Sequence, residues 1–189
     1  AKCVNPECPE RKIMRMVDMF SNLGFKDFSE ESIRALNVTS FTDLMNITYD
    51  RASVLGLVNA KNFMDRLNAL KTNSIQDYKI LTALSFSNIG AEKWKIILKE
   101  VSIEDLVNMN YNDLVHKLIM PTIGVKTAET ICNDRILYKE DLETILKMHN
   151  IISSKGLIDK PKIAFTGVRD KTFIDLLNNN GFNADENYS

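Results

Sequence analysis

The sequence has few of the residues that interrupt helices or cross-link a chain. Its 189 residues include 7 glycines, 4 prolines, 3 cysteines and 2 histidines. An odd number of cysteines argues against a disulfide framework, and little glycine beside many leucines, isoleucines and lysines favours helix. The sequence also lacks an apolar run of membrane-spanning length and a signal-peptide pattern. We therefore expect a mainly α, soluble protein in the cytoplasm, with no membrane partner.

An excess of charge of one sign is absent as well. The chain carries 24 Lys and Arg residues against 25 Asp and Glu residues, for a formal net charge of −1. No global basic field therefore indicates a nucleic-acid partner. With 44% hydrophobic residues, the chain is long enough to bury the cores of one or two small domains.

A pattern that occurs four times organises residues 13–150. Each copy is numbered from a reference residue, the second small position of a turn. The four reference residues are Ser29, Gly56, Gly90 and Gly124, at intervals of 27, 34 and 34 residues. An apolar residue precedes each one, and further apolar residues follow at offsets of four and seven, on one helical face. The preceding residues are Phe28, Leu55, Ile89 and Ile123; those at offset four are Ile33, Ala60, Trp94 and Ala128; those at offset seven are Leu36, Phe63, Ile97 and Ile131. The pattern predicts four helix-hairpin-helix repeats in tandem.

The stretch 118–131 is the best-preserved copy of this pattern. A first helix stops at Pro121, Gly124 supplies the positive φ that a tight turn can need, and a second helix follows. Two shorter helices are predicted between repeats, at Phe41–Ile47 and Ile103–Met109. Each of these begins after a serine that can cap its first turn, and acidic residues follow.

The start of each second helix presents backbone N–H groups that can hold a phosphate. Lysines add local charge, with 7 Lys or Arg against 3 Asp or Glu from Lys61 to Lys99. Because backbone donors do not read bases, the expected ligand is duplex DNA recognised by its shape. The candidate contact residues are Gly56, Leu57, Lys61, Gly90, Ala91, Lys93, Lys95, Gly124, Val125 and Lys126. The alternative is a plain helical scaffold whose lysines are a solvated surface.

The four hairpins are not equally suited to that role. The first has Asp27 and Ser29 where small flexible residues are wanted, and an aspartate repels a phosphate. We therefore expect this hairpin to pack against its neighbours and the third and fourth hairpins to make the best contacts.

Residues 1–12 contain a Cys-x4-Cys pair, Cys3 and Cys8, on either side of an Asn-Pro turn. Such a pair can supply half of a structural zinc site, which takes four ligands. A reduced pair without metal is the equal alternative. The remaining cysteine, Cys132, lies in a helical pattern and is predicted to be a buried thiol.

The helical pattern of the sequence ends after the repeats. Residues 151–161 are predicted to form a linker, and residues 162–189 to begin an α/β unit. A short strand leads into a loop with Thr166 and Gly167, and a helix starts at Thr172. The loop could bind a phosphate at the helix N-terminus, although a plain strand-to-helix turn also explains it. One strand and one helix cannot bury a core by themselves.

These motifs together resemble a known family. Lys-Cys-x-Asn-Pro-x-Cys-Pro at residues 2–9, then the hairpin repeats, then Phe-Thr-Gly at 165–167, is similar to the C-terminal half of NAD-dependent DNA ligases. In that family an adenylation domain and an OB-fold precede a four-cysteine zinc finger, four hairpin motifs and a BRCT domain. The resemblance implies that Cys3 and Cys8 are the third and fourth zinc ligands, and that residues 162–189 open a BRCT-like domain.

The chain departs from the family pattern in two respects. It contains no Lys-x-Asp-Gly, so the lysine that accepts AMP and the NAD site are absent, and the first two zinc ligands are missing. The resemblance therefore implies the DNA-clamping half of a ligase, with no catalytic residue. Its partners would be nicked double-stranded DNA and an adenylation and OB-fold half, on another chain or in a missing region. NAD would act only through that half, and Zn²⁺ would be shared with it.

Two further expectations and two alternatives complete this interpretation. Ala1 following a removed initiator methionine would make the chain a subunit of a split viral or phage ligase. The protein would then work in the cytoplasm of a bacterium or of a virus-infected host cell. The alternatives are a non-catalytic helix-hairpin-helix and BRCT module for DNA repair, and a helical scaffold that binds only protein.

Overall fold

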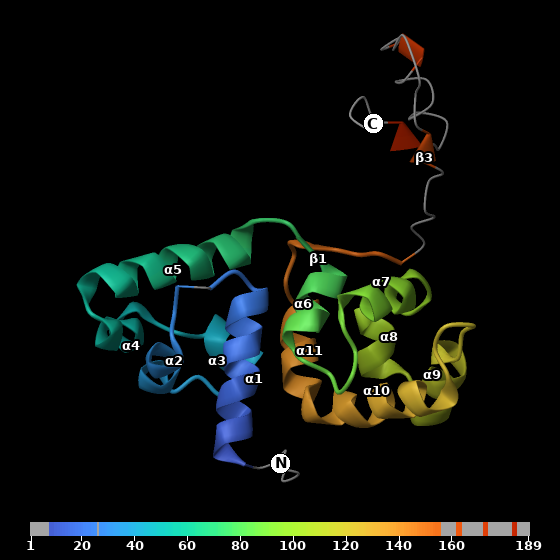
Figure 1. Ribbon diagram of the computed structural model, residues 1–189, viewed down its shortest axis with the longest axis horizontal. Coiled ribbons are helices and arrows are strands. Elements are labelled where there is room, and N and C mark those ends of the chain that lie inside the picture. Colours follow the sequence, from blue (N-terminus) through green and yellow to red (C-terminus); the bar gives the residue numbers. More distant parts are fainter. Residues whose placement is uncertain (1–7, 26, 156–161, 164–171, 174–182, 185–189) are drawn as a thin grey trace. The chain divides into compact units, whose positions relative to one another are not determined.

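The computed structural model describes residues 8–25, 27–155, 162–163, 172–173 and 183–184. The chain divides into two compact units, Ala1–Lys155 and Gly156–Ser189. The first unit is built mainly of helices, so the mainly α prediction is confirmed (Figure 1). Among the described residues, no helix has the length and hydropathy needed to span a membrane.

The first unit contains helices connected by short turns and two very short strands. In chain order its elements are α1 (Pro9–Asn22), α2 (Glu30–Leu36), α3 (Phe41–Met45), α4 (Tyr49–Ala52), the 3-10 turn η1 (Ser53–Leu55), α5 (Leu57–Thr72), β1 (Ile75–Gln76), α6 (Asp77–Ala83), α7 (Ala91–Glu100), α8 (Ile103–Asn108), α9 (Tyr111–Leu118), α10 (Val125–Leu137), α11 (Lys139–Leu146) and β2 (Ile151–Ile152). Strands β1 and β2 pair in parallel, with Ile75 opposite Ile151.

Each reference residue of the repeated pattern lies at the same structural position. Ser29, Gly56, Gly90 and Gly124 are the N-cap residues of α2, α5, α7 and α10. The eight apolar side chains at offsets four and seven are all completely buried, as the pattern predicts. Local helical periodicity therefore builds the core, since every second helix turns the same face inward.

The helices pack as consecutive pairs within two halves. Helix α1 packs on α2, α4 packs on α5, α6 packs on α7, and α9 packs on α10. We call α1 to α5 the N-terminal half and α6 to α11 the C-terminal half. The halves meet where α1 lies beside α6, and where α11 contacts α3 (Figure 1).

A buried carboxylate joins the two halves at the second of these contacts. Asp141 of α11 is 7% exposed and accepts a 2.8 Å hydrogen bond from the backbone N–H of Thr42, in the first turn of α3. The Thr42 and Thr144 hydroxyl oxygens lie 2.9 Å apart in the same contact. A carboxylate at a helix N-terminus satisfies an otherwise unpaired donor and is favoured by the helix dipole.

The two short helices between repeats form where the sequence predicts them. The side chains of Ser40 and Ser102 accept from the backbone N–H groups of Asp43 and Asp105, at the starts of α3 and α8. Ser102 and Asp105 form a complete capping box. Both helices end slightly before the predicted residues.

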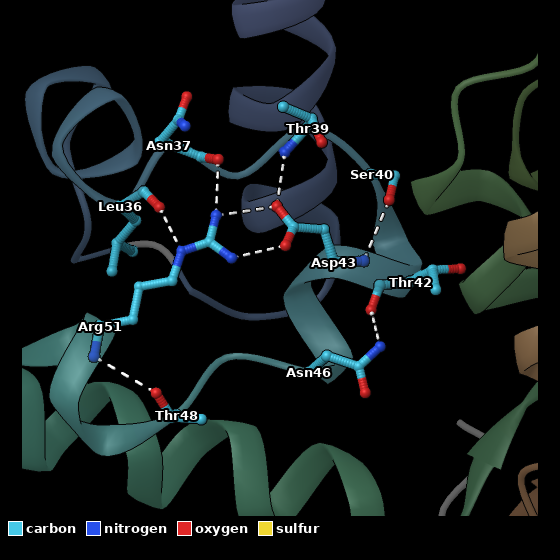
Figure 2. Close-up of polar contacts among 9 residues, drawn as sticks. All are labelled: Leu36, Asn37, Thr39, Ser40, Thr42, Asp43, Asn46, Thr48 and Arg51. Carbon is cyan, nitrogen blue, oxygen red and sulfur yellow. Dashed lines mark hydrogen bonds and ion pairs between the residues drawn. The ribbon is translucent and has the colours of Figure 1, made fainter.

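An arginine closes the loop that joins the first helix pair to the second. Figure 2 shows the guanidinium of Arg51 between the end of α2 and the Asp43 carboxylate. Its Nε donates to the carbonyl oxygen of Leu36 at 2.8 Å, and its Nη2 donates to that of Asn37 at 2.6 Å. Nη1 and Nη2 also bind the two Asp43 oxygens, at 2.5 and 2.9 Å. The planar fork of arginine suits this bidentate contact.

This contact predicts a loss of stability in acid. The hydrogen bond from Arg51 holds the pKa of Asp43 below its ordinary value, and the backbone N–H of Thr39 also lowers it. A carboxylate whose pKa is lower in the folded state stabilises the fold fully above its unfolded pKa of about 4. This stabilisation is lost as the pH falls through the folded pKa. The urea concentration at the unfolding midpoint should therefore decrease when the pH is lowered from 6 to 3. The decrease should be smaller for Asp43→Asn. An equal decrease in both proteins would contradict this assignment.

Residues 151–155, which the sequence analysis assigns to a linker, belong to the first unit, and residues 156–161 of that predicted linker lie outside the described residues. Asp77, only 2% exposed, accepts hydrogen bonds from the backbone N–H and the hydroxyl of Ser154, at 2.6 and 2.5 Å. Lys155 Nζ lies 3.0 Å from the Asp105 carboxylate. This segment therefore ends the helical unit.

In the second unit, β3 (Lys162–Ile163) pairs in parallel with β4 (Asn183–Ala184). Thr172 and Phe173 are helical. Thr166, Gly167 and the rest of the predicted helix lie outside the described residues.

Candidate nucleic-acid interface

Three helices of the first unit begin at a glycine and have no capping side chain. These are α5, α7 and α10, with Gly56, Gly90 and Gly124 at their N-caps. Five other helices have a side chain that accepts from their first turn. The capping residues of those helices, α2, α3, α4, α8 and α9, are Ser29, Ser40, Thr48, Ser102 and Asn110. The three glycine-capped helices therefore start with backbone donors that no cap side chain covers.

The backbone requires a glycine at only one of these three positions. Gly56 has a φ of +82°, a conformation that side-chain-bearing residues rarely adopt. Gly90 and Gly124 have φ values of −96° and −78°, so the prediction of a positive φ at Gly124 is wrong. A Cβ added at either position would meet no atom within 4 Å. Neither conformation nor packing within the described residues explains these two glycines.

The turns before them close by other means. In the fourth pair, the Met120 and Ile123 backbones exchange two hydrogen bonds of 3.0 and 2.9 Å, so the turn is complete before Gly124. In the third pair, Ser85 and Asn88 take the left-handed conformation, with φ values of 59° and 62°. Asparagine tolerates that conformation better than most residues. Both glycines therefore return to extended backbone before the helix starts.

The predicted lysines differ in their surroundings. Lys61 and Lys126 are exposed, as the fifth residue of α5 and the second residue of α10. Lys93 donates to the carbonyl oxygen of Asn88 at 3.3 Å. Lys95 forms a 2.7 Å ion pair with Glu92, which raises the pKa of its ammonium group. Lys95 therefore offers a phosphate less unpaired charge than the other three lysines.

We call the start of the second helix of each pair, with its N-cap residue, the tip of that pair. The tips of the second and fourth pairs are apolar and exposed. Leu57 and Val125, the first residues of α5 and α10, are 78% and 52% exposed. Val58, which the repeated pattern does not mark, is 70% exposed. Ala91 takes the same place in α7. The first turns of α5 and α10 carry no acidic residue, so a phosphate can approach their backbone donors without repulsion. The first turn of α7 carries Glu92, whose charge is paired with Lys95.

The first pair lacks this arrangement. The Ser29 hydroxyl accepts from the backbone N–H of Ser32, and Glu30 and Glu31 follow in the first turn of α2. Asp27 forms an ion pair with Arg66 of α5. The N-terminus of α2 is therefore covered by its own cap and surrounded by carboxylates.

The predicted metal ligands fall at the edge of the described chain. Cys8 is half-buried and immediately precedes α1, whereas Cys3 lies outside the described residues. Within the described residues, no group of three or more His, Cys, Asp or Glu could hold a metal ion. Cys132 is buried, as predicted, and burial raises the pKa of its thiol.

The sequence is similar to those of two curated DNA ligases. It is 28% identical over 120 residues to a DNA ligase of Desulfatibacillum aliphaticivorans, which covers 60% of this chain and 19% of the relative. It is 27% identical over 134 residues to a DNA ligase of Desulfotalea psychrophila (strain LSv54 / DSM 12343), covering 68% of this chain and 19% of the relative. No family model matches the chain.

The alignment covers only part of each relative. The chain spans about a fifth of the length of these curated relatives. No solved structure matches it to a significant degree. The two similarities relate this chain to DNA ligases.

Proposed function

We propose that this chain is the DNA-binding portion of an NAD-dependent DNA ligase. Its helix pairs would be helix-hairpin-helix motifs that grip nicked duplex DNA through the phosphate backbone, without reading base sequence. The second unit would open a BRCT-like domain. The adenylation and sealing steps would belong to residues that this sequence does not contain, because it has no Lys-x-Asp-Gly.

One observation supports this proposal above the others: nothing in the described part of the chain gives Gly90 and Gly124 a conformational or steric reason to be glycine. Serine, asparagine or aspartate at an N-cap stabilises a helix slightly more than glycine does. The same unit uses such caps on α2, α3, α4, α8 and α9. A helix start left uncovered is suited to an anion, since its N–H groups and its dipole both favour negative charge. The sequence relationship to DNA ligases makes a DNA phosphate the natural ligand.

Binding to nicked duplex should weaken steeply with salt. If Lys61, Lys93 and Lys126 each neutralise one phosphate, the slope of log K against log salt should be about −3. Lys126→Ala should reduce the slope by about 1 for duplexes of any sequence. Lys139→Ala, on α11 and outside the three tips, is the matched control and should leave the slope unchanged. Fluorescence anisotropy with two unrelated nicked duplexes measures these values, and a salt-independent or absent interaction would contradict the proposal.

A reconstitution experiment separates a ligase portion from a non-catalytic repair module. The chain is mixed with an adenylation and OB-fold half that carries the missing cysteine pair, and nick sealing is assayed with NAD. We expect the mixture to seal nicks and to retain zinc, because Cys3 and Cys8 supply two of the four ligands that structural zinc takes. DNA binding without any gain in sealing would favour the repair module.

A further inference from the structure

The turn of the third helix pair is held by a helix of the fourth pair. Asp134, in the last turns of α10, accepts a 2.6 Å hydrogen bond from the backbone N–H of Ser87. The Tyr138 hydroxyl donates to the carbonyl oxygen of Ser85 in the same turn, at 3.3 Å. The Tyr138 and Phe86 ring centroids are 4.7 Å apart. Three successive residues of the turn therefore contact the end of α10.

A similar contact between a helix and a turn occurs at the equivalent place in the N-terminal half. Arg66 of α5 donates to the carbonyl oxygen of Gly24 at 2.5 Å and pairs with Asp27, both in the turn of the first pair. Arg66 lies ten residues after Gly56, and Asp134 lies ten residues after Gly124. In each half, the second helix of the later pair holds the turn of the earlier pair. The charge is opposite, but the position in the repeat is the same.

The third turn needs such support more than its neighbours do. It contains Ser85 and Asn88 in the left-handed conformation, which is unfavourable for residues other than glycine. The fourth turn closes itself through Met120 and Ile123. The second turn uses Gly56 for its positive φ.

Helix α10 therefore contributes to two candidate contacts. Its N-terminus is the tip at Gly124, and about 14 Å further along its axis Asp134 fixes the turn that leads to Gly90. Arg135 fastens α10 in place by donating to the carbonyl oxygens of Leu106 and Met109, at 3.0 and 2.8 Å.

We propose that Asp134 is a positioning residue that makes the tips at Gly90 and Gly124 act as one rigid two-point grip on the DNA backbone. It touches no DNA itself and acts through the Ser87 amide. This inference rests on the proposed function. Two contacts held at a fixed spacing bind more tightly than two independent ones, because the second contact costs less ordering.

The sign of one substitution tests this proposal. A surface carboxylate near DNA repels phosphates, so its removal should tighten binding. Glu129→Ala, an exposed position on the same helix, should therefore bind nicked duplex as tightly as the unchanged chain or more tightly. Asp134→Ala should instead bind about tenfold more weakly, with a salt slope lower by about 1 because the third tip no longer contributes. Equal or tighter binding by Asp134→Ala would overturn the proposal.

A conservative variant separates positioning from a general loss of folding. Asp134→Asn keeps an oxygen that can accept from Ser87, so it should retain affinity within about twofold. A loss as large as that of Asp134→Ala would overturn the role of the acceptor. The exchange rate of the Ser87 amide, measured by NMR without DNA, should rise in Asp134→Ala and stay low in Asp134→Asn. If the unchanged chain binds no DNA, the proposed function fails; if it binds and Asp134→Ala binds equally well, only this inference fails.

Discussion

The double substitution Gly90→Asp and Gly124→Asp is expected to lower the affinity for nicked duplex DNA about 100-fold. Each new carboxylate would lie at a helix N-terminus, beside the proposed position of a phosphate. The negative charges of the carboxylate and the phosphate would repel each other. Each would also accept hydrogen bonds from the backbone donors that the phosphate needs. The measurement is a binding titration at low salt, where electrostatic effects are largest.

The same substitutions should leave the protein folded and slightly stabilise it. Both glycines have ordinary φ values and open space around a Cβ, and aspartate is a better N-cap than glycine by a few tenths of a kcal/mol. We therefore expect an unchanged or higher melting temperature together with weaker binding. Opposite signs for stability and affinity are characteristic of a binding site.

A neutral variant is the control for this result. Gly90→Asn with Gly124→Asn places a side chain of the same shape without the charge. We expect it to lose affinity as well, but less than the aspartates, because it covers the donors without repelling the phosphates. If both double variants bind DNA as the unchanged chain does, the tips at Gly90 and Gly124 are not contact sites.

Phe63→Ala is expected to cause a large loss of stability in the N-terminal half. Phe63 is completely buried, and its ring centroid lies 5.4 Å from that of Phe25 and 5.3 Å from that of Phe28. Truncating such a residue costs about 3–5 kcal/mol, through lost burial and the cavity left behind. The free energy of unfolding, from urea titration followed by circular dichroism, should fall by that amount.

Two variants define what this loss means. Phe63→Leu retains most of the volume and should cost about 1–2 kcal/mol. Asn62→Ala, at the exposed neighbouring position of α5, should change stability by less than about 0.5 kcal/mol. A small effect of Phe63→Ala would show that the aromatic cluster around the first turn does not support the fold.

The parts of this fold that follow local rules could be predicted from the sequence. Helical periodicity is enough to place Trp94 and Ile97 on the buried face of α7, and both are completely buried. Serine caps are equally local, because Ser102 needs only Asp105, three residues away, to complete its box. Such features depend on neighbours within one or two turns, which the sequence displays directly.

Other features depend on partners that are distant in the chain. Asp134 and Ser87 are 47 residues apart, and Arg66 and Asp27 are 39 residues apart. No periodicity connects such pairs. Once one of the two contacts is known, the sequence shows that Arg66 and Asp134 occupy the same position in the repeat. The repeated pattern does not show the conformation of Gly124 either, because the hydrogen bonds between Met120 and Ile123 complete the turn before it.

The contacts of Ser154 and Lys155 also determine how the helical unit would carry mechanical load. Tension arriving along the chain from residue 156 would reach these two residues first. Ser154 would pass it to Asp77 at the start of α6, and Lys155 would pass it to Asp105 in α8. The parallel pair of β1 and β2 would be loaded only after those contacts break. Two separate helices would therefore share a pull on the second unit before any helix of the N-terminal half is strained.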